Sequence, residues 1–121
     1  MTSYNEVAMT SYNEVVMADN NKVAMTSYNE VVMTYNNEVA MTDNNVVCGS
    51  HKNEVSFEKR TIVVLGNESK VKGHKGSWFV LYERDSKGEI INAVTTKIDG
   101  KKIKEDTWYK LENGKIVETN K

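Results

Sequence analysis

An eight-residue repeat constrains this chain more than any other feature of its sequence. It begins as MTSYNEVA-MTSYNEVV and returns, with small changes, to about residue 72. Valine holds the seventh place of every octad from Val7 to Val71, and asparagine holds the fifth place from Asn5 to Asn53. In an α-helix, valines eight residues apart would be rotated by about 80° at each step and would share no face. The period itself excludes a heptad coiled coil.

Each octad fits one short strand followed by one corner. In the stretch EVAMT (residues 6–10), alternation points Val7 and Met9 to one side and the other side chains to the opposite side. The stretch SYN (residues 11–13) is turn-like, because asparagine tolerates the left-handed conformation and its side chain bonds nearby backbone. One octad cannot bury its Val-Met face alone, so octads must stack. The sequence therefore predicts an all-β protein, a β-solenoid of octapeptide repeats.

The eighth place of the octad indicates how many octads form one coil. It alternates between alanine and valine over the first five octads, so the true period is sixteen and two octads form one coil of a flattened, two-sided solenoid. One outer face then carries the alanines beside mostly glutamates, and the other becomes apolar toward its C-terminal end. Because an exposed apolar strip usually marks an interface, we expect this face to mediate self-association or to be buried beneath the C-terminal segment. Its residues are Val16, Val32, Val46, Cys48, Ile62 and Val64.

The repeats fade after residue 72, which divides the chain into two parts. Residues 1–72 are predicted to form the octapeptide-repeat solenoid, and residues 73–121 a small C-terminal antiparallel β cap. A cap is expected there because terminal repeats need a polar closing layer. At the other end the repeat starts with Met1 itself, so we expect the first coil to present open strand edges that pair with another chain.

The cap sequence alternates strand-like runs with turn signals. Asp99-Gly100 is a hairpin signal, and Asn113-Gly114 is a turn that leads into the last strand-like run. The run at 106–111 fits either a turn or a short strand. The three clearer strand-like runs cover residues 77–84, 89–98 and 115–118.

Two stretches of the C-terminal segment, GNESKVKGHKGSWFVLYERD and IDGKKIKEDTWYKLENGKIVE, carry a resemblance to a known group. With the octads before them, they resemble uncharacterised octapeptide-repeat proteins of gut bacteria and their phages, which end in a domain of unknown function. This resemblance covers about residues 61–118, and the repeats agree in period rather than in letters. It implies a β-solenoid and a phage or bacterial origin, and it carries over no catalytic residues. A weaker similarity is to octapeptide β-helices of phage spikes, but the first six octads lack glycine, which disfavours their intertwined trimer.

Composition and charge limit the classes of partner that the chain can bind. Net charge is −1, but residues 1–57 hold seven acidic residues and two lysines, so this part should repel nucleic acid. No apolar run approaches the roughly 18 residues of a membrane helix, and no signal peptide is visible at the start. The single cysteine, Cys48, cannot form an internal disulfide. We expect no nucleic-acid polymer and no membrane as partner, and a cytoplasmic or virion-associated location.

The sequence offers little for catalysis, a metal or a cofactor. His51 and His74 are isolated, and no His/Cys cluster has the spacing of metal ligands. Cys48 lacks a neighbouring base, so packing is expected rather than nucleophilic catalysis. The threonine column suggests ice binding as a function, but the interruption at Ala18 and the flanking glutamates disfavour it. Its members are Thr2, Thr10, Thr26, Thr34 and Thr42.

Three functions follow, in order of preference. The first is a non-enzymatic structural or interaction protein that forms homo-oligomers. The second is a module that binds a small ligand, such as a phage protein sequestering a nucleotide signal or a protein that binds glycans. The third is ice binding. The candidate ligand contacts are Tyr4, Tyr12, Tyr28, Tyr35, Lys70, Lys72, Lys75, Trp78 and Arg84, with the basic stretch expected to share a pocket with Trp78.

Overall fold

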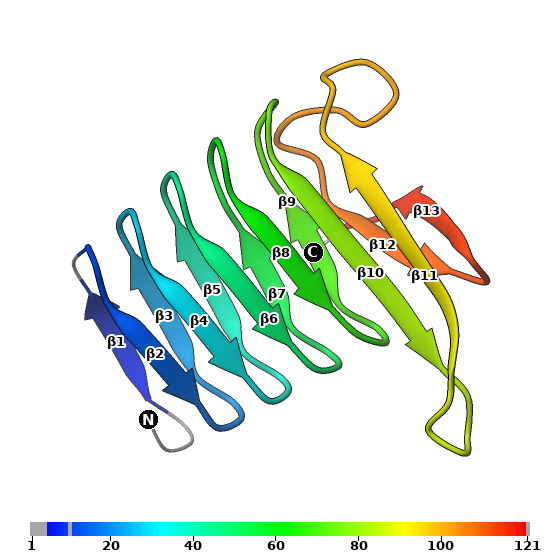
Figure 1. Ribbon diagram of the computed structural model, residues 1–121, viewed down its shortest axis with the longest axis horizontal. Coiled ribbons are helices and arrows are strands. Elements are labelled where there is room, and N and C mark those ends of the chain that lie inside the picture. Colours follow the sequence, from blue (N-terminus) through cyan, green and yellow to red (C-terminus); the bar gives the residue numbers. More distant parts are fainter. Residues whose placement is uncertain (1–4, 10, 121) are drawn as a thin grey trace.

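A computed structural model describes residues 5–9 and 11–120 of the chain. The described residues contain thirteen strands and no helix. They wind into a β-solenoid of about five coils, which confirms the predicted fold with two octads in each coil. Figure 1 shows the coils following one another along the chain, from β1 and β2 at one end to the longer β10 and β11 at the other. No helix in the described part of the chain has the length and apolar character needed to span a membrane.

Two sheets form the two walls of the solenoid, and successive octads alternate between them. Sheet A consists of β1 (Glu6–Met9), β3 (Lys22–Met25), β5 (Glu38–Met41), β7 (Glu54–Ser56), β9 (Lys70–Lys72), β12 (Tyr109–Glu112) and β13 (Lys115–Glu118). Sheet B consists of β2 (Glu14–Met17), β4 (Glu30–Met33), β6 (Val46–Gly49), β8 (Ile62–Leu65), β10 (Trp78–Arg84) and β11 (Ile90–Lys97).

The strands of each wall pair in parallel at a register of sixteen residues. Val7 lies beside Val23 in sheet A, and Val15 lies beside Val31 in sheet B. Because side chains alternate along a strand, this register places every valine of the seventh place inside. Methionines of the first place lie beside them in the core, which later takes in Phe57 and Leu65. The expected division into an apolar inside and a more polar outside is therefore present in both walls.

The corners depend on two successive octad places with different tasks. The fourth place has a positive φ near 60° even where it is not asparagine, as at Tyr12 (63°) and Lys52 (58°). The fifth place is the buried asparagine column. The backbone N–H of Asn21 donates to Oδ1 of Asn37 at 2.9 Å, and Asn37 Nδ2 donates to the carbonyl of Ala18 at 2.9 Å. Each asparagine thus ties its own corner to the neighbouring coils.

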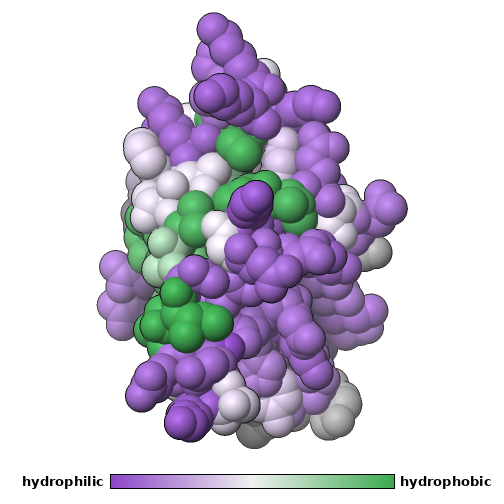
Figure 2. Space-filling view, turned by 90° about the vertical axis from the view of Figure 1, so that its right-hand side faces the viewer, coloured by the Kyte–Doolittle hydropathy of each residue, from purple (hydrophilic) through white to green (hydrophobic). Residues whose placement is uncertain are grey.

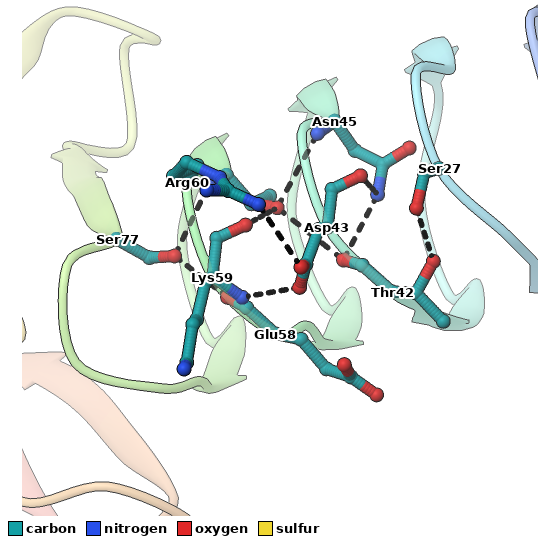
Figure 3. A network of polar contacts seen from close by, with 9 residues as sticks. Ser27, Thr42, Asp43, Asn45, Glu58, Lys59, Arg60 and Ser77 are labelled. Carbon is teal, nitrogen blue, oxygen red and sulfur yellow. Dashed lines mark hydrogen bonds and ion pairs between the residues drawn. The ribbon is translucent and has the colours of Figure 1, made fainter.

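The later coils keep this column with smaller side chains. The N–H of Asn45 donates to Thr61 Oγ1 at 3.3 Å, and the N–H of Thr61 donates to Ser77 Oγ at 3.0 Å. A second set of bonds runs along the outside of the same corners, where Asp43 accepts from the N–H of Lys59 at 2.8 Å (Figure 3). The corners are therefore bonded both inside and outside the wall.

At the C-terminal end both walls change from parallel to antiparallel pairing. β10 still pairs in parallel with β8, with Phe79 beside Val63, so the repeat register continues past residue 72 to Leu81. β11 then pairs antiparallel with β10, and β12 pairs antiparallel with β9 and with β13. The antiparallel cap is thus an extension of the two sheets. Inside it, the rings of Phe79 and Tyr109 lie 6.3 Å apart between the walls.

The predicted hairpin at Asp99-Gly100 is wrong, because β11 and β12 belong to different sheets. Asp99 instead holds a loop that crosses between the walls. Its carboxylate accepts from the N–H groups of Lys101 at 2.8 Å and Ile103 at 3.1 Å, which lowers its pKa below the usual 3.8. Ile98 is buried and Ile103 packs on the core, so tertiary packing decides the path. The Asn113-Gly114 turn does join a hairpin, with positive φ at both residues.

Candidate functional site

The outer face of sheet B, here called face B, is the apolar surface that the repeat predicted. Two columns of side chains run across its strands. The sixth-place column changes from Glu14 and Glu30 to apolar residues on the later strands. The eighth-place column is apolar through its solenoid strands. The exposed members include Val16 (69%), Val32 (54%), Val46 (51%), Ile62 (42%) and Trp78 (44%), with Cys48 also exposed and Val64 half-buried.

Two alternatives were expected for face B, self-association or burial beneath the C-terminal segment, and its exposure bears on the second. The C-terminal segment does not cover it, because β11 adds to the edge of sheet B rather than lying over its strands. The alternative of burial beneath that segment is therefore wrong. At the C-terminal end of the stack, Ile90 and Ile91 of β11 are also exposed. Figure 2 looks onto that end and shows apolar patches set among hydrophilic residues.

The outer face of sheet A, here called face A, differs in both columns. Its eighth-place column is Ala8, Ala24, Ala40 and Ser56, and these small side chains form the floor of a groove of about 650 Å³. Charged side chains of the sixth place line one side, among which Lys22 and Glu38 form an ion pair at 4.0 Å. The groove ends at Lys72 and Trp108, where the Lys72 Nζ lies 5.3 Å from the ring centroid.

The candidate ligand contacts that the structure describes do not gather in one place. Lys72 lies on sheet A and Trp78 on sheet B, so the predicted pocket that they would share does not exist. Lys75 belongs to a corner, and its N–H donates to Glu105 Oε1 at 2.7 Å. Lys70 Nζ donates to the carbonyl of Asn120 at 3.0 Å, while Arg84 Nη1 donates to that of Gly88 at 2.7 Å.

The tyrosines are divided between the two lines of corners. Tyr12 and Tyr28 stack on each other with their centroids 5.1 Å apart, and Tyr35 stacks on His51 at 5.0 Å. Tyr4 lies outside the described residues, as do Thr2 and Thr10. Stacking covers one face of each ring, and the side chains remain exposed on the outside of the corners.

The remaining polar groups are engaged in local bonds. Thr26 bonds Ser11 and Thr42 bonds Ser27, each with hydroxyls 2.7 Å apart, so these two threonine hydroxyls are engaged at the corners. His74 Nε2 lies 2.8 Å from Asp106 Oδ1. Within residues 5–9 and 11–120, no three His, Cys, Asp or Glu side chains gather in a way that would hold a metal ion.

Two side chains matter to these faces but were missed from the sequence. Trp108 closes the groove of face A, and Lys97 lies on face B with its Nζ 5.8 Å from the Trp78 ring centroid. Both reach their places through antiparallel pairing, of β12 with β9 and of β11 with β10. The octad period ends before these strands, so no repeat signal gives their register.

Comparisons of the chain with protein-family models, with curated proteins and with solved structures found no match.

Proposed function

We propose that the protein is a non-enzymatic structural or interaction protein that associates with a second copy of itself through face B. The observation that carries the proposal is the contiguous apolar surface from Val16 to Trp78. Removing such a strip from water lowers the free energy of the system and favours association. The alanine and glutamate columns of face A offer no comparable apolar area.

The dimensions of face B set the expected strength of this association. Six strands at about 4.8 Å each and four residues at about 3.3 Å each give a plane of about 29 by 13 Å. This is at the small end of protein interfaces, so we expect a reversible association in the micromolar range or weaker.

Sedimentation velocity over a concentration series from about 10 to about 500 µM tests the proposal. The chain should sediment faster as its concentration rises. Val32→Lys places a charge in the centre of the apolar column and should weaken the association by at least about tenfold. Ala24→Lys makes the same kind of change at the same octad place on face A and should leave the association unchanged. A wild-type chain that stays monomeric throughout, or equal effects of the two variants, would contradict the proposal.

A second candidate function is ligand binding in the groove of face A. Trp108 favours it, because an aromatic side chain at the end of a groove can stack on a flat ligand. Glu6, Glu38 and Glu54 line the groove with Lys22 and Lys72, and the remaining excess of negative charge disfavours phosphates weakly. The groove therefore suits neutral oligosaccharides better than nucleotides.

Tryptophan fluorescence titration with short neutral oligosaccharides, and separately with nucleotides, tests this second candidate. An oligosaccharide should change the emission of the wild-type chain and of Trp78→Ala, but not that of Trp108→Ala. Nucleotides should give no change. A response that survives Trp108→Ala would place the ligand elsewhere, and no response to any sugar would remove the candidate.

A further inference from the structure

Face B carries opposite charges at its two ends. Glu14 on β2 and Glu30 on β4 lie at the N-terminal end and are direct neighbours in the register. Lys97 lies at the other end on β11, beside Trp78 of β10. Between them the sixth-place column is apolar, at Val46 and Ile62. Along the solenoid axis, face B is therefore acidic at its N-terminal end, apolar in the middle and basic at its C-terminal end.

These charges are not neutralised within one chain. Among residues 5–9 and 11–120, Glu14, Glu30 and Lys97 form no ion pair. Like charges at neighbouring positions of a sheet repel each other, so Glu14 and Glu30 destabilise the isolated face. Lys97 is five strand steps from Glu14, or about 24 Å, which is about three Debye lengths at physiological salt. Within the described part of one chain, the carboxylates of Glu14 and Glu30 therefore face no cation on face B, and Lys97 has the Trp78 ring beside it but no carboxylate partner.

We infer that two copies pair through face B with their solenoid axes antiparallel, so that Glu14 of each copy faces Lys97 of the other. This inference rests on the proposed self-association. A two-fold axis parallel to the strands, between β6 and β8, places each β2 opposite β11 of the second copy and each β4 opposite β10. The contact is isologous, so the favourable charge pair occurs twice.

The alternative face-to-face pairing keeps the two solenoid axes parallel. The strands would then run in opposite directions across the contact, so Glu14 and Glu30 of one copy would lie against Val16 and Val32 of the other. The acidic ends of the two copies would still lie together, and so would the two ends that carry Lys97. Both arrangements cover the apolar centre, so the charges at the ends decide between them. Charges at the edge of an interface fix orientation in this way more than they raise affinity.

Charge reversal at each end tests the antiparallel arrangement. Glu14→Lys puts a lysine opposite Lys97 in both contacts, and Lys97→Glu puts a glutamate opposite Glu14 in both contacts. Each single variant should therefore associate roughly tenfold more weakly than the wild-type chain. The double variant Glu14→Lys/Lys97→Glu restores opposite charges across the contact and should associate as the wild-type chain does. An equimolar mixture of the two single variants should also recover, by forming mixed dimers. Glu58→Lys, an exposed change outside face B, serves as the control.

The outcomes separate this inference from the proposal beneath it. In the parallel arrangement each reversal replaces like charges with like charges, so single and double variants would all match the wild-type chain and the inference would be overturned while self-association stands. If the wild-type chain itself does not associate in sedimentation, the proposed function fails. Circular dichroism of each variant checks that the fold is kept.

Discussion

At the residue scale, the fifth-place asparagine of an octad can join three coils, as Asn37 does. Asn37 is fully buried, accepts from the N–H of Asn21 and donates to the carbonyls of Ala18 and Tyr35. Its own N–H donates to Oδ1 of Asn53 at 2.9 Å. Because the Tyr35 carbonyl also accepts from the N–H of Asn20, removing this side chain leaves two groups of the neighbouring coil without a partner, the N–H of Asn21 and the carbonyl of Ala18.

We expect Asn37→Ala to lower the free energy of unfolding by about 2 to 4 kcal/mol, since it orphans a buried N–H and a buried carbonyl. The neighbouring Asn36→Ala is the control, with an expected cost of about 1 kcal/mol for alanine at a φ of 58°. Asn37→Ser should cost less than Asn37→Ala, because Ser69 accepts from a backbone N–H at the same octad place. Urea unfolding measures all three, and equal costs for Asn36→Ala and Asn37→Ala would refute the asparagine column as the stabilising element.

The sequence identified this column but only part of its role. The fifth place is visible as a conserved letter of the repeat, and its buried bonds follow from the coil register. The left-handed conformation belongs to the fourth place, where Tyr12, Lys52 and Arg60 adopt it despite a Cβ that resists it. Local preference could not reveal this, because stacking of the coils overrides it.

At the element scale, a large core side chain on one strand is matched by a glycine on or next to a neighbouring strand. Gly73 follows β9, and a Cβ placed there would overlap the ring of Phe57 from the preceding coil of sheet A. Gly49 on β6 is similarly enclosed, because a Cβ would lie 2.8 Å from Leu65 and 3.1 Å from Met33. These glycines replace methionine in the first octad place where a neighbour already fills the space.

Gly73→Ala should therefore destabilise the protein by about 2 kcal/mol or more through overpacking. Phe57→Leu alone should cost about 1 to 2 kcal/mol through lost burial. The double variant should cost less than the sum, because leucine leaves room for the new methyl group. Thermal or urea unfolding of the four chains gives this coupling, and strictly additive costs would show that the two side chains do not compete for space.

Elements inside the repeat could be predicted from the sequence, and those outside it only in part. The strands of the first eight octads follow from period and alternation, and the strand at 115–118 follows from its Asn-Gly turn. The path of the chain after Ile98 could not be predicted from the sequence. An Asp-Gly pair signals a turn, but it does not indicate which sheet the next strand joins. That choice depends on Ile98, Ile103 and Tyr109 packing onto a core that exists only after the stack has formed.

At the scale of the whole molecule, the two outer faces give the protein two chemically different sides. The apolar residues of face B could be predicted, because the sixteen-residue period assigns them to one wall. The charge pattern that orients a partner could not, since Lys97 enters face B through an antiparallel strand with no repeat signal. The groove of face A was missed for the same reason, because Trp108 is placed by β12, the antiparallel strand that begins at the next residue.

The sixteen-residue register also decides how such a gene can change in length. Loss or duplication of sixteen residues removes or adds one whole coil, and every asparagine, valine and outer column meets its usual neighbour again. Loss or duplication of a single octad keeps the reading frame and the core pattern, yet it moves every later strand to the opposite wall. Valines and alanines would then share one outer column, and the continuous apolar strip would be cut in two. Selection for an intact face B would therefore favour repeat numbers that change by two.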